Sequence, residues 1–179
     1  TVEPVTAADR KAAEFVLSLG GGVRVNGSSF PVSAKDLPKD PFRLTWANVS
    51  LNKNVTDADL ANFKECKNLA SLSFSGTPVG DAGLAHLKEL KNLTELHLWG
   101  TKVGDAGLVH LKECKNLTSL NLEGTQVTDA GVDHLKQFAQ LTRLDLKDTK
   151  VTAKKIDELR AALPKCKIVW NGGTVEPKK

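Results

Sequence analysis

The chain has 179 residues, 40% of them hydrophobic, and its 25 Lys and Arg against 21 Asp and Glu give a formal net charge of +4. This length allows one well-buried domain or a small cap followed by an array, and the interspersed charges are untypical of nucleic-acid-binding proteins, whose basic residues cluster on one face. No apolar run approaches the ~18–20 residues of a membrane-spanning helix, so we expect no membrane insertion.

The chain starts at Thr1 and contains no Met, so we expect it to be a processed form or a piece of a longer protein. Residues 1–43 predict a cap made of a helix and a hairpin. Thr6-Ala7-Ala8-Asp9 resembles a capping box, and the helix after it, over residues 10–19, ends at three glycines. Segments 23–25 and 30–32 flank a polar turn and indicate a hairpin. We expect this cap to cover the open strand edge of the array that follows.

Residues 44–170 repeat one apolar pattern at a nearly constant interval. Pairs of apolar residues one position apart recur after 23 residues once and after 24 residues four times. The pairs are Val49/Leu51, Leu72/Phe74, Leu96/Leu98, Leu120/Leu122, Leu144/Leu146 and Ile168/Trp170. A further apolar residue stands three positions before each of the first five pairs, at Trp46, Leu69, Leu93, Leu117 and Leu141. The alternation predicts a strand, and the helical spacing of Leu84, Leu87 and Leu90 predicts a short helix after it. Such units bury their apolar faces only by stacking on one another.

Asp-Ala-Gly marks the expected start of most of these helices. The aspartates are helix caps or first-turn carboxylates, at Asp57, Asp81, Asp105 and Asp129. A helical glycine costs ~1 kcal/mol relative to Ala, so we interpret Gly83, Gly107 and Gly131 as sites of close approach between neighbouring units. Asp59 and Lys155 replace this glycine in the first and last units, as expected of terminal repeats, so the array looks complete. Threonines are expected to hydrogen-bond the turns, at Thr77, Thr101, Thr125 and Thr149.

The frame L-x-x-L-x-L-x-G-T-x-V, followed by D-A-G-L, resembles leucine-rich repeats. It is similar to the cysteine-containing repeats of F-box-type adaptors and to arrays in bacterial proteins, some of them attached to kinases. The resemblance covers residues 44–170 and implies an α/β fold. The fold would be a right-handed solenoid, with a parallel sheet on the concave face and short helices on the convex face. We expect residues 171–179 to be a disordered tail.

His86, His110 and His134, one per central repeat, are the most suggestive group for a metal or hydrolase site. Adjacent packed helices lie ~8–10 Å apart, whereas zinc needs its ligand nitrogens within ~2.1 Å of one point. We therefore interpret these histidines as helix-surface or packing residues. The sequence contains no nucleophile elbow, phosphate-binding loop or kinase motif, so no catalytic residue, metal or cofactor is predicted.

The three cysteines are predicted to be free, buried thiols. Cys66 and Cys114 occupy the same position two repeats apart, which corresponds to ~10 Å between strands, and a disulfide needs Cα atoms within ~7 Å. Free thiols fit a reducing compartment but do not require one, so a cytoplasmic location and an extracytoplasmic one in a receptor-like protein both stay open.

Polar residues between and beside the strand leucines form the candidate binding surface. In the leucine-rich repeat family the corresponding face is the concave, ligand-binding one. Trp99 has two interpretations: it anchors a partner, or it folds onto the repeat turn as a packing residue. The candidate partner-binding residues are Trp99, His97, Glu95, Asn121, Glu123, Arg143 and Asp145.

The leading hypothesis is a monomeric, non-catalytic recognition module that binds a protein or peptide partner through its concave face. The alternative is a sensory or scaffolding segment of a larger signalling protein, such as a bacterial receptor-like kinase. Thr-Val-Glu-Pro occurs at residues 1–4 and again at 174–177, which fits either a repeated linker in such a protein or coincidence. No nucleic-acid partner is predicted.

Overall fold

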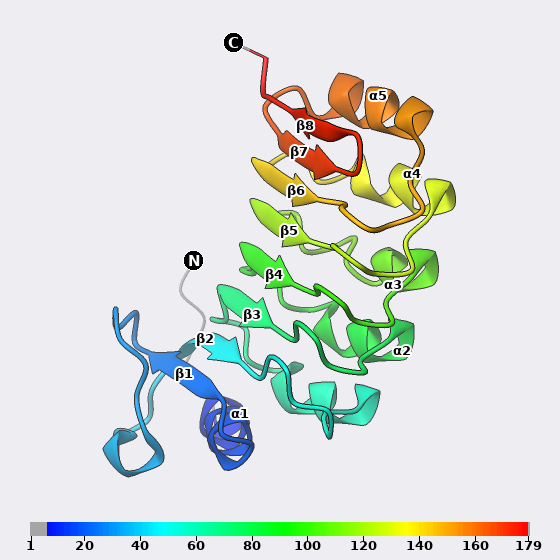
Figure 1. Ribbon diagram of the computed structural model, residues 1–179. Helices are drawn as coiled ribbons and strands as arrows, with labels where there is room; N and C mark the ends of the chain where they lie inside the picture. The colour runs from blue at the N-terminus through cyan, green and yellow to red at the C-terminus, as the bar shows by residue number, and fades with distance from the viewer. Residues whose placement is uncertain (1–6, 179) are drawn as a thin grey trace.

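The computed structural model describes residues 7–178. Eight strands form one sheet in chain order, and helices lie along one face of this sheet (Figure 1). The strands are β1 (Gly22–Val25), β2 (Leu44–Asn48), β3 (Ser71–Ser73), β4 (Glu95–His97), β5 (Ser119–Asn121), β6 (Arg143–Asp145), β7 (Lys167–Trp170) and β8 (Gly173–Val175). Strands β2 to β7 run parallel, while β1 and β8 pair antiparallel at the two edges.

The helical segments that connect the parallel strands are short, and most of them hold only one or two turns. The α-helices are α1 (Ala7–Ser18), α2 (Asp81–Leu84), α3 (Asp105–Val109), α4 (Val132–Leu135) and α5 (Ala153–Ala162). The 3₁₀ helices are η1 (Ala34–Asp36), η2 (Asp57–Phe63), η3 (Ala85–Leu87) and η4 (Asp129–Gly131). No helix within residues 7–178 combines the length and apolar character needed to cross a membrane.

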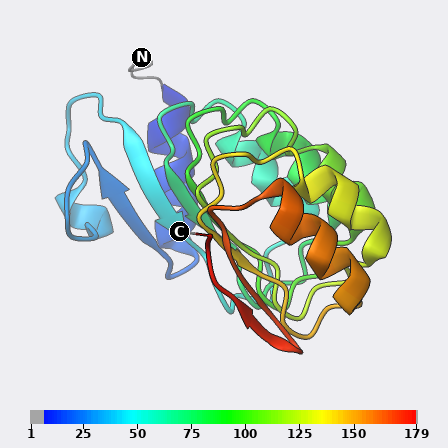
Figure 2. The ribbon, with the colours of Figure 1, turned by 90° about the horizontal axis from the view of Figure 1, so that it is seen from above.

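The hydrophobic core lies between the sheet and these helices. Leu72, Leu96 and Leu120 are successive register partners on β3, β4 and β5, and each is fully buried. Viewed along the stack, α2 to α5 lie on one side of the parallel strands, while the edge strand β1 and the light-blue η1 segment lie at the far left, away from these helices (Figure 2). The chain therefore folds as the α/β leucine-rich repeat solenoid that the repeat pattern predicts.

The first repeat has a different register from the predicted one. Ala47 is the partner of Leu72 across β2 and β3, and Ala47 and Val49 are the buried pair of this repeat. Leu51, predicted to lie in the core, is 64% exposed and has a φ of 65°. Trp46, also predicted to be a core residue, pairs in register with a serine of β3 and lies on the opposite face.

An extra residue in the first turn explains this error. Six positions separate Val49 from Val55, whereas five separate the corresponding Phe74 from Val79. Because apolar residues alternate at 47, 49 and 51, the pattern permits two registers that differ by two residues. Leu51 consequently occupies the left-handed turn position that a glycine holds in the next three repeats.

Both ends of the sheet differ from the predicted organisation. The prediction of a disordered tail is wrong for Gly173–Val175, which form β8 against β7. At the other end β1 pairs mainly with β2, and the segment predicted as its hairpin partner contributes one bridge, from Val32 to Val23. Each addition pairs a strand edge that would otherwise be exposed. Thr6 of the predicted capping box lies outside the described residues.

Hydroxyl groups satisfy the turns as predicted. The threonine that follows each turn donates a hydrogen bond of 2.6–2.8 Å to the backbone carbonyl three residues earlier. These threonines are Thr77, Thr101, Thr125 and Thr149.

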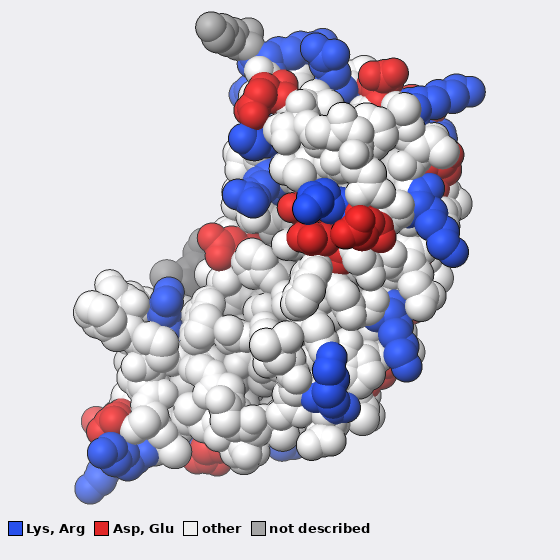
Figure 3. Space-filling model, in the orientation of Figure 1, with Lys and Arg blue, Asp and Glu red and all other residues white. Residues whose placement is uncertain are grey.

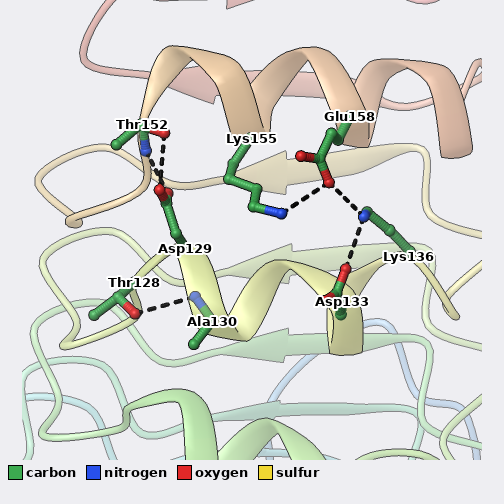
Figure 4. Close-up of polar contacts among 8 residues, drawn as sticks. All are labelled: Thr128, Asp129, Ala130, Asp133, Lys136, Thr152, Lys155 and Glu158. Carbon is green, nitrogen blue, oxygen red and sulfur yellow. Dashed lines mark hydrogen bonds and ion pairs between the residues drawn. The ribbon is translucent and has the colours of Figure 1, made fainter.

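Aspartates in the first helical turn link each repeat to the next. Asp81 Oδ1 accepts the N–H of Gly104 at 2.7 Å. The same bond joins Asp57 to Gly80, Asp105 to Thr128 and, in Figure 4, Asp129 to Thr152. The carboxylate lies over the helical glycine of the next repeat, since a Cβ added to Gly107 would be 2.5 Å from Asp81 Oδ1. These glycines are therefore sites of close approach, and the neighbouring group is an aspartate.

The last two helices are joined by ion pairs as well. Lys155, which stands where the central repeats have glycine, and Lys136 both contact Glu158 Oε2, at 2.9 and 2.7 Å (Figure 4). Lys136 Nζ also lies 2.7 Å from Asp133 Oδ1. Hydrogen bonds from Lys136 and then Lys155 lower the pKa of Glu158 to about 2.

Candidate functional site

The face of the sheet away from the helices, which we call the open face, carries its side chains in rows. The strand register places six residues in the first row: Trp46, Ser71, Glu95, Ser119, Arg143 and Lys167. The second row contains Asn48, Ser73, His97, Asn121, Asp145 and Val169. A third row lies two residues beyond the second row, after β2 to β6, and contains Ser50, Ser75, Trp99, Glu123 and Lys147.

Charge is unevenly distributed over these rows. The positions of β2 and β3 contain only Trp, Asn and Ser. The exposed and half-buried acidic residues, Glu95 and Glu123, belong to β4 and β5, while Asp145 on β6 is only 6% exposed. Basic residues follow on β6 and β7. Figure 3 shows the same order, with a largely uncharged lower part, acidic side chains near the middle, and basic ones above them. The open face is therefore mixed in charge, as predicted, but ordered along the stack.

Trp99 lies partly on the neighbouring turns and partly in solvent. Its Cζ3 is 3.6 Å from the place where Gly76 would carry a Cβ, and its Nε1 is 4.0 Å from the corresponding place on Gly124. Both glycines have a positive φ, near 65°, and their missing side chains leave room for the indole. Trp99 nevertheless remains 42% exposed. Packing and exposure thus coexist in this residue.

Glu95 lies between two polar neighbours on the open face. Ser71 Oγ donates to Glu95 Oε2 at 3.0 Å, and His97 Nε2 lies 3.9 Å from the same oxygen. In a Ser-His-acid triad the imidazole contacts the serine and the carboxylate orients the imidazole. Here the carboxylate contacts the serine, so this trio lacks the arrangement that activates a serine nucleophile.

The other predicted site residues have different environments. Asn121 Oδ1 accepts the N–H of Glu123 at 2.9 Å, and Asp145 Oδ1 accepts the N–H of Lys147 at 3.1 Å, so both side chains shape the strand ends. Asp145 is only 6% exposed. Glu123 Oε1 lies 3.9 Å from Lys147 Nζ. Arg143 is exposed and forms no ion pair with any residue from 7 to 178.

Two surface residues were missed because the first repeat was misaligned. The guanidinium of Arg24 lies over the Trp46 ring, 4.7 Å from its centroid, and Gly22 lies beside the same ring. Leu51 Cδ2 is 2.8 Å from the place of a Cβ on Gly76, which Trp99 also approaches. The extra residue in the first turn was the signal that could have located both Trp46 and Leu51.

The histidine and cysteine side chains offer no alternative site. His86, His110 and His134 are half-buried, and no group of three or more His, Cys, Asp or Glu within residues 7–178 is arranged to hold a metal ion. All three cysteines are buried and free. Burial raises the pKa of Cys66 and of Cys114 to about 12, so both stay protonated thiols at neutral pH.

Comparison with known proteins identifies the repeat. A family model described as "Leucine Rich repeat" matches residues 85–111 and 113–135. No curated protein matches the chain. The structure of an internalin from Listeria monocytogenes is similar, with a TM-score of 0.55 and 20% identity over 63% of this chain and 31% of the internalin. A leucine-rich repeat protein from Leptospira interrogans has a TM-score of 0.48 and 25% identity over 60% of this chain and 27% of its own. The chain spans less than a third of either protein.

Proposed function

We propose that the chain recognises a protein or peptide through its open face. The chain is a leucine-rich repeat protein, and this fold commonly serves as a protein-interaction module. Trp99 is the anchor of this surface. The polar residues around it are Glu95, His97, Asn121, Glu123 and Arg143. The exposure of Trp99 near the centre of the rows carries the proposal.

A partly exposed tryptophan suits this role on physical grounds. Trp and Arg are enriched among the residues that dominate binding energy, and such residues lie near the centre of an interface. An indole can bury ~150–250 Å² and offers one N–H for orientation. Because Trp99 already lies against the turns of two neighbouring repeats, little freedom remains for a partner to restrict.

The proposed module is non-catalytic. Its thiols are buried and protonated, and the order of contacts from Ser71 to Glu95 to His97 does not supply a base to the serine. Asp145 is largely buried beneath this surface, so we expect it to hold the strand end in place and not to contact a partner directly.

The area of the rows limits the affinity. Six strands at ~4.8 Å, each with about three residues at ~3.3 Å, give ~250 Å² in flat projection. Side-chain relief can double this area, which still falls short of the ~800 Å² per partner of a standard interface. We expect weak or transient binding by the rows alone, and tighter binding only where the turns or the cap also contribute.

Replacing Trp99 tests the proposal. Peptides selected from a phage-displayed random library against the immobilised chain are synthesised and titrated against purified variants by calorimetry. Trp99→Ala should weaken their binding by at least ~2 kcal/mol, about thirtyfold. Val109→Ala is the matched control, because Val109 is similarly exposed, at 43%, but lies on the helical side. Equal affinities for wild type and Trp99→Ala would refute the assignment of the anchor.

The alternative, a sensory or scaffolding segment of a larger signalling protein, would use the same surface. The two hypotheses differ in the domains that they expect on either side of this chain, so the adjoining gene sequence distinguishes them. A kinase domain or a membrane span next to this chain would favour the sensor.

A further inference from the structure

Two opposite charges lie in the first row of the open face with one short residue between them. Glu95 is the register partner of Ser119, which is the register partner of Arg143. Neighbouring strands are ~4.8 Å apart, so the backbones that carry the two charges are ~10 Å apart. Ser119 is too short to fill the space above it.

The two charges do not neutralise each other. The Glu95 carboxylate turns the other way, toward Ser71 and His97. Arg143 has no ionic partner within residues 7–178. Of the other charged residues on this face, Glu123 Oε1 lies 3.9 Å from Lys147 Nζ, Lys167 pairs with Glu176 at 2.9 Å, and Asp145 is only 6% exposed. Glu95 and Arg143 are therefore the charges of the first row that stay open to a partner.

An apolar patch lies beyond the carboxyl ends of β2 and β4. Leu51 and Trp99 are 64% and 42% exposed, and both lie within 4 Å of the position of a Cβ on Gly76. Gly76 thus lies between these two exposed apolar side chains. Trp99 follows Glu95 by four residues, or ~13 Å along the strand direction. The patch extends the binding area beyond the strands onto the turns.

We propose that the partner is a protein segment with a basic side chain for Glu95, an acidic side chain for Arg143, and an apolar side chain for the patch of Leu51 and Trp99. This inference rests on the proposed function and adds the chemistry and direction of the partner. The order of charge along the stack orients the segment, with its basic residue over β4 and its acidic residue over β6. A uniformly anionic polymer would meet Glu95 and Glu123 at the middle of the face, where like charges repel.

The spacing also restricts the segment. A separation of ~10 Å corresponds to residues seven apart on one side of an α-helix at ~1.5 Å per residue. In an extended chain, side chains that point to the same face are two or four residues apart, at ~6.6 or ~13 Å, so a helical segment matches the separation of Glu95 and Arg143 better.

Charge reversal on both sides of the complex tests the inference. Peptides from the random phage library that bind the wild-type chain are titrated against Glu95→Lys, Arg143→Glu and the double variant. We expect the peptides to carry one basic and one acidic residue, and each single reversal to weaken binding about threefold to tenfold, as suits exposed charge pairs. A peptide with its own two charges exchanged should bind the double variant within about threefold of the original affinity. Lys112→Glu, a reversal outside the rows, should have no effect.

Three outcomes would overturn the inference. Peptides that bind the reversed variants as well as wild type, yet are lost with Trp99→Ala, would refute the charge assignment and leave the proposed function standing. Peptides unaffected by Trp99→Ala and by both reversals would refute both, as would a selection without any peptide that binds the open face.

Discussion

A methyl group on Gly107 should separate two repeats, because the place of its Cβ is already occupied. In Gly107→Ala the new carbon would lie 2.5 Å from Asp81 Oδ1 and 3.2 Å from both Leu84 Cδ1 and Val103 Cγ1. The aspartate cannot simply rotate away, since the same oxygen accepts the N–H of Gly104 at 2.7 Å. Either the carboxylate moves and leaves that N–H without its partner, or the repeats move apart.

Three effects set the magnitude. Overpacking costs ~1–3 kcal/mol, and an unpaired N–H that is largely buried costs ~1–3 kcal/mol. Alanine gains back ~1 kcal/mol in helix propensity. We expect a net loss of about 2 kcal/mol in the free energy of unfolding, or roughly 4–8 °C in Tm for a chain of this size.

Urea unfolding of a double-mutant cycle measures this effect. In an Asp81→Ala background only the 3.2 Å contacts with Leu84 and Val103 remain, so Gly107→Ala should then cost less than ~0.5 kcal/mol, a coupling of about 1.5 kcal/mol. Gly104→Ala is the matched control, because its Cβ would lie at an ordinary 3.6 Å from Asp81 Oδ2. Equal costs of Gly107→Ala in the two backgrounds would show that the aspartate is not the reason for the glycine.

Two further predictions concern stability. Leu51→Gly should leave the free energy of unfolding unchanged or raise it by up to ~1 kcal/mol, because glycine favours the φ of 65° that this exposed leucine adopts. A loss of ~2–5 kcal/mol in urea unfolding, typical of a buried leucine, would instead support the register predicted from the sequence. The pKa of Glu158 is about 2 in the folded chain against an ordinary value of 4.5, so its ion pairs stabilise the folded state above about pH 4.5 and that contribution disappears as the pH falls toward 2. The difference in stability between wild type and Glu158→Gln should accordingly shrink between pH 5 and pH 2 in thermal unfolding, and a constant difference would contradict the ion-pair assignment.

The repeat architecture was readable from the sequence because each unit carries its own local pattern. Leu72, Leu96 and Leu120 recur at the period of the stack, and units that share a core must place such residues in register. The hydroxyl role of Thr101 was also predictable, since its partner lies three residues away in the same turn. The candidate surface followed from the alternation of each strand.

Contacts between repeats and at the ends of the sheet required the tertiary structure. The aspartate over Gly107 belongs to the previous repeat, so only stacking brings the two together. The register of β2 was ambiguous by two residues, because alternation repeats with that period and the extra residue in the turn was not recognised. Strand β8 pairs with the edge of β7 that would otherwise be unpaired. The residues of β8 carry no local sequence pattern that predicts this pairing. The Glu95 carboxylate contacts Ser71 of the neighbouring strand β3 and forms no ion pair with Arg143 two strands away. Only the packing of the strands shows which of these neighbours the carboxylate contacts.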